Sequence, residues 1–330
     1  MTNRMIFRAC AGLLLLAVTS RAGAQHMTHA ELLGKPAATS AMVQCLFDDS
    51  VEFSAEYGTA SGSYSAQTPW GPAVAAGQPA EAVMTGLTPD TRYFYRVRYR
   101  HPGAASAVQH GAAEHTFHTQ RKLGSAFTFI VQADPHLDAM SDTALYRRCL
   151  QNELADSGDF MIDLGDFLMN DKLANAQKQV TFDTIDYRCH LLRRYYEAIG
   201  HSLPLFNALG NHEGEAGWYL NGQATSIPVM SSLERKRYFV NPTPDNFYTG
   251  DTSHQPMIGQ RGNYFAWTWG DALFIVLDPY YYTNPKPDSL HGWHWSLGKT
   301  QYDWLRSTLE SSKATSVSYT HLTLPTIYSV

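Results

Sequence analysis

Cysteine is scarce in this sequence, and its acidic and basic residues nearly balance. Only 4 of the 330 residues are cysteines, and Cys10 lies in an N-terminal apolar stretch. The others, Cys45, Cys149 and Cys189, are too sparse for a cysteine-rich metal site. In an oxidising compartment Cys149 could pair with Cys189, and the alternative is that all three are buried free thiols. The net charge of −5 excludes a broad basic surface for nucleic acid.

The sequence also lacks a long hydrophobic run. A bilayer-spanning helix needs about 20 apolar residues, whereas the first apolar run covers only residues 13–18, and no later segment is long enough. This short run follows Arg4 and Arg8 and precedes Ala22-Gly23-Ala24, the order of a secretory signal peptide and its cleavage site. We therefore expect residues 1–24 to be a signal peptide and the mature protein to be secreted or periplasmic. An anchoring helix is the alternative.

The chain does have enough apolar sequence for two cores. Its 330 residues, 44% of them hydrophobic and 17% charged, are typical of a globular protein with two domains. Residues 25–120 are predicted to be an all-β sandwich, with strands at residues 41–47 and 51–57. In residues 91–100 Tyr and Val alternate with Arg, the pattern of a strand with one face against a core. The arginines then form a basic stripe that is either an interaction surface or a solvated strand face.

Residues 121–315 change to an α/β pattern. Apolar runs predict three buried strands, the first of them covered on both faces, at residues 126–132, 160–164 and 203–209. Helices are expected between them, at residues 141–154, with Ser141 as the cap, and at 173–199. Strands that alternate with helices predict an α/β sandwich, in which ligands gather at the carboxyl ends of the strands.

The rest of this region is less regular. Residues 214–261 are either a lid or a packed surface excursion. A hairpin is predicted at residues 262–278, and an amphipathic helix at 300–313. Between them, His291 and His294 either line a cleft or belong to a surface loop packed on its own aromatic residues.

A polar cluster follows each predicted buried strand. The clusters are Asp134-Pro135-His136, Gly165-Asp166 and Gly210-Asn211-His212-Glu213. Because parallel strands end at one edge of a sheet, we expect the clusters to meet there. Carboxylates and imidazole together suit first-row metal ions, and the two oxygens of Asp166 could bridge two of them. The small Gly165 and Gly210 would let the backbone come close to the ligand.

The ordered trio resembles the Asp-x-His, Gly-Asp and Gly-Asn-His-Asp/Glu pattern of the calcineurin-like metallophosphoesterases. The resemblance implies two divalent or trivalent metal ions (iron, manganese or zinc). Asp134 and His136 would bind one ion, Asn211 would bind the other, and Asp166 would bridge them. The implied fold is an all-β sandwich followed by an incomplete α/β four-layer-type metallophosphoesterase sandwich.

The same resemblance implies a reaction. His212 would be catalytic, as a general acid or transition-state stabiliser at the phosphate, and Glu213 would orient it. The expected reaction is hydrolysis of a small-molecule phosphate ester by metal-activated water, as in acid phosphatases. The alternatives are a phosphodiesterase or nucleotidase on the same scaffold, and a non-catalytic exported surface protein.

The run Leu87-Thr88-Pro89-Asp90-Thr91-Arg92-Tyr93 resembles the corner of a fibronectin type III-like sandwich, where a Tyr hydroxyl ties back to upstream backbone. The N-terminal domain thereby resembles that of purple acid phosphatases. The chain departs from this subgroup at His136, where the subgroup carries Gly, and at Met169, where it carries the iron-binding Tyr. We therefore expect a colourless site.

The end of the chain departs further from the family. The family continues with a strand ending in His and a Gly-His-x-His motif, and residues 316–330 do not match that pattern. We expect them to be a foreign tail on a truncated chain, in which His321 does not replace a missing ligand. Such a chain would bind metal weakly and have little or no turnover.

Overall fold

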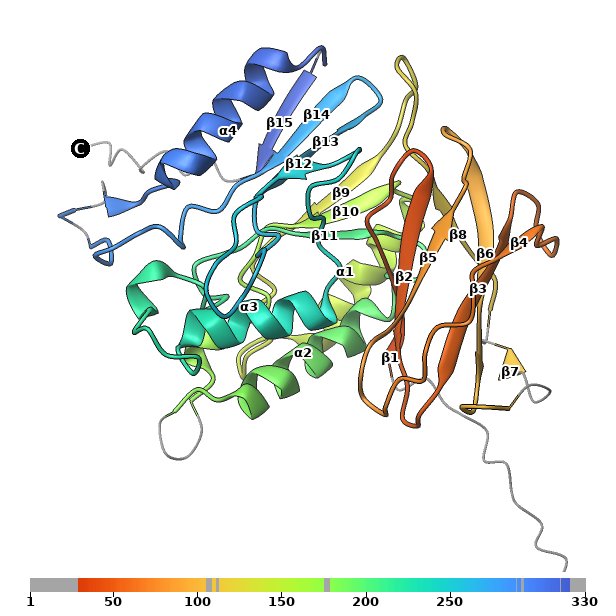
Figure 1. Cartoon of the computed structure of the whole chain (residues 1–330), viewed down its shortest axis with the longest axis horizontal. Helices are drawn as coiled ribbons and strands as arrows, with labels where there is room; N and C mark the ends of the chain where they lie inside the picture. Colours follow the sequence, from red (N-terminus) through yellow and green to blue (C-terminus); the bar gives the residue numbers. More distant parts are fainter. Residues whose placement is uncertain are drawn as a thin grey trace, which may run out of the picture.

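Figure 1 shows a computed structural model of the chain, which describes residues 29–104, 109–110, 113–174, 179–288, 290–291, 294–314 and 316–320. The predicted signal peptide and most of the predicted tail lie outside these residues. An all-β part forms one side of the molecule, and a mixed α/β part forms the other (Figure 1). Among the described residues, no helix is long and apolar enough to cross a membrane.

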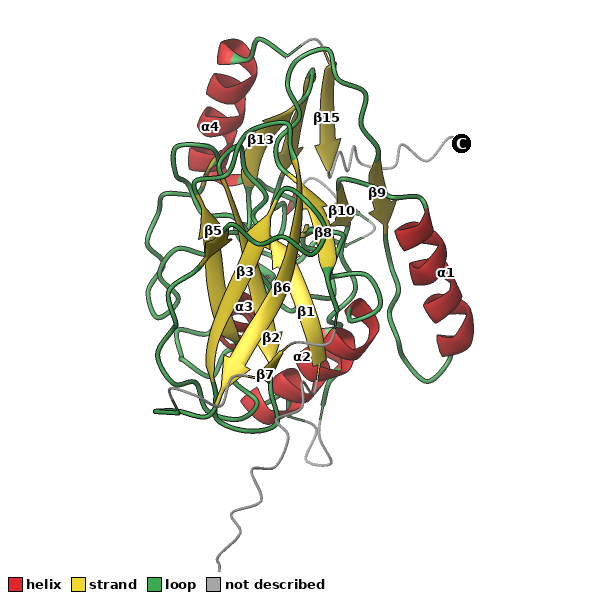
Figure 2. Ribbon diagram, turned by 90° about the vertical axis from the view of Figure 1, so that its right-hand side faces the viewer, coloured by secondary structure: helices red, strands yellow, loops and turns green. Residues whose placement is uncertain are grey.

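The all-β part contains two sheets. One has the strand order β1 (His29–Gly34), β2 (Ser40–Leu46), β5 (Ala80–Thr85). The other has the order β4 (Ala66–Gln67), β3 (Glu52–Gly58), β6 (Arg92–Arg100), β7 (Gln109–His110), and β8 (His115–His118) also pairs with β6. The long strands of both sheets run side by side in Figure 2. They enclose one core, which contains Val43, Phe53 and Tyr95.

Strand β6 confirms the predicted alternation. Its Tyr93, Tyr95, Val97 and Tyr99 are all buried, and the residues between them are more exposed. The backbone N–H of Thr88 donates to the hydroxyl of Tyr93 at 2.9 Å. This bond is the tie to upstream backbone that the sandwich resemblance implied.

Three of the four arginines of β6 are paired with glutamates. Arg96 and Arg98 donate to Glu56 at 2.7 and 2.6 Å, and Arg100 donates to Glu52 at 2.6 Å. Both glutamates come from the adjacent strand β3. Because β3 neutralises the basic stripe, the structure favours a solvated strand face over an interaction surface.

The α/β part also contains two sheets. The first is parallel, with the order β11 (Leu205–Asn207), β10 (Phe160–Asp163), β9 (Phe129–Gln132). The second has the order β12 (Thr249–Gly250), β13 (Phe265–Trp269), β14 (Ala272–Val276), β15 (Ser316–Thr320). Aromatic side chains join them, since the ring centroid of Phe160 lies 5.6 Å from that of Trp267 and 5.2 Å from that of Phe274.

Helices pack against both sheets of the α/β part. Helices α1 (Thr143–Ala155), α2 (Phe182–Tyr196) and α3 (Ile227–Tyr238) share a core with β10 and β11. Helix α4 (Gly298–Ser311) packs on β13 and β14. Two short 3-10 helices, η1 (Asn170–Lys172) and η2 (Gly217–Tyr219), follow β10 and β11. The predicted alternation of strands and helices, the hairpin and the last helix are confirmed.

Two predictions about the first strand and helix are wrong. Strand β9 is an edge strand, and its Phe129 and Val131 are 36% and 50% exposed, so described residues do not cover both of its faces. A hydrophobic run shows that a strand is apolar but not where it lies in the sheet. The cap of α1 is Asp142, whose carboxylate accepts two backbone N–H groups of the first turn, whereas the Ser141 hydroxyl donates to Asp138.

The three described cysteines are free. Cys45 and Cys189 are buried, but Cys149 is exposed. The possible pairing of Cys149 with Cys189 is therefore wrong, and the expectation of buried thiols holds for two of the three. Cys149 is exposed because α1 buries only Leu150 fully against the core.

Candidate metal centre

The three parallel strands end in register, which brings the loops after them together. Asp163, the last residue of β10, pairs with Gln132, the last residue of β9. It also pairs with Asn207, the last residue of β11. Each predicted polar cluster begins within three residues of one of these positions. The expectation that the clusters meet at one sheet edge is confirmed.

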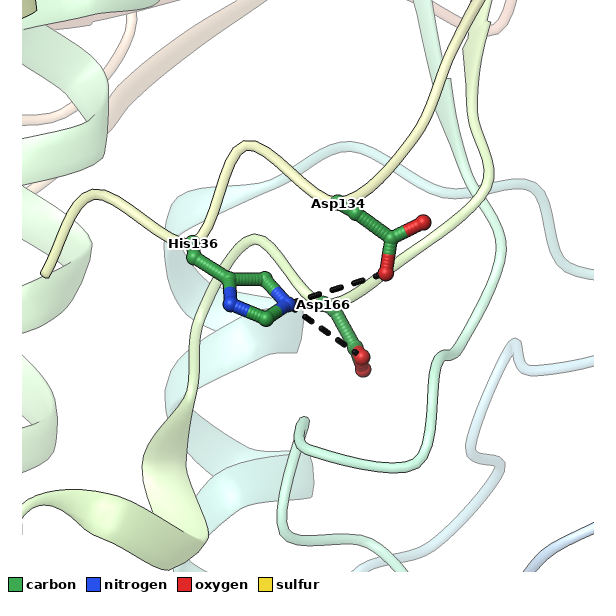
Figure 3. Close-up of side chains that lie close together, drawn as sticks. All are labelled: Asp134, His136 and Asp166. Atoms are coloured by element: carbon green, nitrogen blue, oxygen red, sulfur yellow. Dashed lines mark ion pairs between the residues drawn. The ribbon is translucent and has the colours of Figure 1, made fainter. Parts of the chain in front are cut away.

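Asp134, His136 and Asp166 form a cluster of potential metal ligands (Figure 3). The Nε2 of His136 lies 3.6 Å from Oδ1 of Asp134 and 3.7 Å from Oδ2 of Asp166. One ligand atom from each residue lies within 4.8 Å of the others, a geometry that no other such trio has in the described part of the chain. Two atoms that each bind one ion at about 2.1 Å are roughly 3–4 Å apart, so the cluster fits a single first-row metal ion.

The ligand loops have backbone conformations that L-amino acids rarely adopt. The φ angle is 54° at Asp134, 47° at His136 and 57° at Asp166, all in the left-handed region. Each such residue costs on the order of 1–3 kcal/mol and persists only where the surroundings fix it. Here the loops fix each other, because the N–H of Asp134 donates to the Gly165 carbonyl at 3.0 Å and that of His136 to the Asp166 carbonyl at 3.2 Å. Strain of this kind is typical of functional sites.

The third loop joins the cluster through the backbone of His212. Its N–H donates to Oδ1 of Asp166 at 2.8 Å. The rings of His136 and His212 lie 6.1 Å apart at an interplanar angle of 89°. Asn211, the ligand expected for a second ion, is exposed beside them. The third loop is therefore held against the one carboxylate that was expected to bridge two ions.

Glu213 does not contact His212 in the way that was predicted. Its buried carboxylate accepts backbone N–H groups from Asp166 at 3.0 Å, Phe167 at 2.9 Å and Leu168 at 3.2 Å, and one from Gly210. Burial, followed by the charge of Asp166, raises the pKa of Glu213 to about 8, although the backbone donors oppose this shift. Its observed role is to tie the loops after β10 and β11 together.

The residue that contacts the His212 ring is Asp171, which sequence reasoning missed. The Nδ1 of His212 lies 3.0 Å from both carboxylate oxygens of Asp171, whose side chain is only 4% exposed. This contact leaves Nε2 as the other ring nitrogen available to a ligand. Asp171 follows Asp166 by five residues in η1, so the only signal in the sequence was a second acid shortly after Gly-Asp.

Gly165 and Gly210 are needed because the loops touch each other. A Cβ on Gly165 would lie 2.1 Å from the backbone nitrogen of Gly210, and φ at Gly165 is 107°. A Cβ on Gly210 would lie 2.2 Å from Oδ1 of Asp166. The two glycines were expected to let the backbone come close to a ligand. In the structure they instead let the loop after β10 and the loop after β11 come close to each other.

A buried carboxylate lies beneath the loops. Asp163 accepts the N–H of Gly165 at 3.0 Å and bonds from the amide of Gln132 and the hydroxyl of Tyr196. Burial raises the pKa of Asp163 to about 6, against the lowering effect of these bonds. The sequence predicted Asp163 only as part of a strand, because no local feature distinguishes it from any other residue at the end of a strand.

An aromatic group lies beside the site. Tyr280, in the loop after β14, is buried, and burial raises its pKa together with the negative charges of Asp166 and Glu213. Trp295 packs edge-on against Tyr280, with the ring centroids 5.0 Å apart, and against Trp218 at 5.5 Å. The loop after β14 therefore contributes Tyr280 to one side of the site, a residue that the sequence patterns did not single out.

For His291, His294 and the long segment 214–261, the structure favours the second of the two alternatives that the sequence left open. His291 and His294 stack with ring centroids 5.2 Å apart, and Nδ1 of His291 lies 3.0 Å from Asp288. This arrangement agrees with a packed surface loop. Residues 214–261 contain α3 and the buried ion pair of Arg235 with Glu215, so they form a packed excursion.

Two solved structures resemble the whole arrangement. A structure of PhoD matches with a TM-score of 0.62 and 17% identity, over 89% of this chain and 61% of that chain. A structure of purple acid phosphatase PPD1 isolated from yellow lupin (Lupinus luteus) seeds matches with a TM-score of 0.54 and 16% identity, over 88% of this chain and 50% of that chain.

At these identities the likeness concerns the fold alone, which resembles the folds of PhoD and of this purple acid phosphatase. The chain spans less than two thirds of the length of either protein. No protein-family model and no curated protein matches its sequence.

Proposed function

We propose that this chain is a metal-dependent phosphoesterase that hydrolyses a small-molecule phosphate ester. The observation that carries the proposal is the cluster of Asp134, His136 and Asp166 on strained loops at the carboxyl edge of a parallel sheet. An ion pair with a purely structural role does not need three residues in left-handed backbone conformations, whereas strained conformations of this kind are common at ligand sites. The metallophosphoesterase-like fold supports the same interpretation.

Each polar residue has a role in this proposal. Asp134 and His136 would hold one ion, Asn211 would hold a second, and Asp166 would contribute to both. Such ions polarise a phosphoryl oxygen and lower the pKa of a bound water. The carboxylate, imidazole and amide donors suit iron, manganese or zinc. With its Nδ1–H bonded to Asp171, a doubly protonated His212 would donate from Nε2 to a phosphate oxygen or to the leaving group.

The finer architecture and the location belong to the same proposal. Residues 25–120 would be the fibronectin type III-like sandwich, residues 121–315 the four-layer-type metallophosphoesterase domain, and residues 316–330 would lie outside the family pattern. Residues 1–24 would direct export to the periplasm or the medium. N-terminal sequencing of the exported protein should begin after Ala24, and a protein that keeps residues 1–24 would contradict export by cleavage.

Metal binding and ester hydrolysis test the function together. Calorimetric titration with Zn²⁺ and Mn²⁺ should show binding that Asp166→Asn abolishes. The matched control is Asp303→Asn, which removes an exposed carboxylate from α4 and should leave binding unchanged. Metal-dependent hydrolysis of p-nitrophenyl phosphate is expected, at the low rate predicted above for this chain. Preference for bis(p-nitrophenyl) phosphate would favour the phosphodiesterase alternative, and a metal-loaded full-length protein that cleaves neither ester would contradict the proposal.

A further inference from the structure

Helix α2 inserts a buried arginine between the two loops that carry the ligand cluster. Arg188 is only 4% exposed, and burial lowers the pKa of its guanidinium. Its hydrogen-bond partners are main-chain carbonyls instead of carboxylates. A buried charge must have its donors satisfied, so these carbonyls are what keep Arg188 at this position.

The carbonyls come from both ligand loops. In the loop after β9, Arg188 donates from Nη1 to the carbonyl of Leu137 at 2.9 Å and from Nη2 to that of His136. In the loop after β10, it donates from Nε to the carbonyl of Leu168 at 2.7 Å and from Nη2 to that of Phe167 at 2.7 Å. One planar guanidinium therefore bonds to the backbone of both loops. In one loop it contacts His136, a candidate ligand, and in the other it contacts Phe167, the residue after the candidate ligand Asp166.

The geometry points to Arg188 as a positioning residue that sets the separation of the two ligand loops and thereby the metal affinity of the site. This inference rests on the proposed metal site. The guanidinium is rigid and presents its donors in a fixed fork, so it holds four carbonyls in one arrangement. That arrangement includes the left-handed residues His136 and Leu137, with φ of 47° and 51°, which local sequence does not favour.

The same helix supplies a matched control. Arg193 lies on α2 and is 1% exposed. It donates to the carbonyl of Tyr238 at 2.7 Å and to that of Gln44 at 3.2 Å, so it joins α2 to α3 and to the β-sandwich. Arg193 is thus a buried arginine with carbonyl partners, and the two partners named here, Tyr238 and Gln44, lie outside the ligand loops.

The experiment compares Arg188→Lys and Arg188→Met with Arg193→Lys and Arg193→Met in the full chain. Thermal melting in EDTA measures the stability of each apo protein, and competition with a chromogenic chelator measures the affinity for Zn²⁺. The Arg188→Met variant should bind Zn²⁺ about 10- to 100-fold more weakly than wild type, the usual effect of removing a group that orients ligands. Arg188→Lys, which keeps the charge and some donors, should lose less affinity. Both Arg193 variants should melt earlier but keep wild-type Zn²⁺ affinity.

Each result has a defined meaning. Arg188 variants that are folded and bind Zn²⁺ as wild type does would overturn the inference while leaving the proposed function intact. Equal losses of affinity in the Arg193 variants would also overturn it. If both Arg188 variants fail to fold in saturating Zn²⁺ while the Arg193 variants fold, Arg188 is a residue of the general core and the inference is wrong. Failure of the wild-type chain to bind metal would instead contradict the proposed function.

Discussion

The side chain of Asp171 is buried, yet its partners are polar groups of the site. Besides the His212 ring, it accepts a bond from the hydroxyl of Tyr219 at 3.4 Å and lies 3.5 Å from the Lys172 ammonium. A carboxylate behind an imidazole selects the ring tautomer and orientation. At the scale of single residues, Asp171 therefore sets the orientation of the His212 ring.

The Asp171→Asn variant tests this role. An amide is neutral and nearly isosteric with the carboxylate, so the fold should persist while His212 loses its fixed orientation. We expect kcat/KM for p-nitrophenyl phosphate to fall by roughly 10- to 100-fold with no change in metal affinity. The control is Asp183→Asn, which changes an exposed acid in the first turn of α2. Unchanged turnover in Asp171→Asn would show that the contact is not functional.

Gly210 provides a second test at this scale. In Gly210→Ala the new Cβ would lie 2.2 Å from Oδ1 of Asp166, so the loops after β10 and β11 must separate. We expect a loss of stability of about 1–3 kcal/mol, as for other overpacked sites, together with weaker metal binding. The control is Gly71→Ala, where the nearest atom would be 3.5 Å away, an ordinary contact. Urea unfolding and metal titration should distinguish the two, and equal effects would contradict the close approach.

A buried ion network joins the elements around the site. Arg261 donates to Glu215 at 2.6 Å and to Asp278 at 2.7 Å, and Arg235 of α3 also pairs with Glu215. Asp278 in turn accepts the backbone N–H of Tyr280 at 2.9 Å. The network therefore connects the loop after β11, helix α3 and the loop after β14.

Breaking this network should destabilise the protein strongly. Glu215→Gln leaves the buried guanidinium of Arg235 without its carboxylate and leaves Arg261 with Asp278 alone, and breaking a buried pair usually costs about 3–5 kcal/mol. The exposed pair of Glu310 with Arg306 on α4 is the control, and Glu310→Gln should cost no more than about 1 kcal/mol. Urea unfolding at pH 7 measures both.

The buried carboxylate of Glu215 should also make the stability of the protein depend on pH in the acid range. Its arginine partners lower the pKa of Glu215 from 4.5 to about 2, although burial opposes the shift. The stabilisation is therefore complete above pH 4.5 and is lost as the pH falls towards 2. Over that range the free energy of unfolding should fall less in Glu215→Gln than in wild type. If the two proteins lose stability in parallel as the pH falls, the ion network is not the source of the acid dependence.

At the scale of the whole molecule, the β-sandwich packs on the α/β part through aromatic and imidazole rings. The rings of His115 and His201 stack with centroids 4.0 Å apart, and the hydroxyl of Tyr95 donates to the carbonyl of His201 at 2.6 Å. Burial, followed by the charge of His201, lowers the pKa of His115 from 6.5 to about 4. This contact between the two parts therefore requires a neutral His115.

Acid should weaken that contact. Because the folded pKa of His115 is lowered, its contribution is fully present above pH 6.5 and is lost as the pH falls through about 4. His115→Phe keeps a ring but removes the proton, so its free energy of unfolding should fall less than that of wild type between pH 7 and 4. His291→Phe, at an exposed histidine, should follow wild type. Denaturant titrations at several pH values measure the difference.

Much of the site could be predicted because its first ligands are local features of the sequence. Asp134, His136 and Asp166 each follow closely after an apolar run that predicts a strand, and parallel pairing is sufficient to bring strand ends together. The contacts of Asp171, Glu213 and Arg188 were not predictable in this way. The contacts of Asp171 with His212, of Glu213 with Phe167 and of Arg188 with His136 join residues 41 to 52 positions apart, and they depend on how η1 and α2 pack behind the loops.

The sequence by itself determined the order of strands and helices and the three polar clusters at the strand ends, because periodicity and strand-end position are local properties. Only the tertiary structure decided that β9 is an exposed edge, that Glu213 ties loops together while Asp171 holds His212, and that Arg188 spans the ligand loops. Those features arise from distant segments that meet in the folded chain, where burial and hydrogen-bond geometry select the partners.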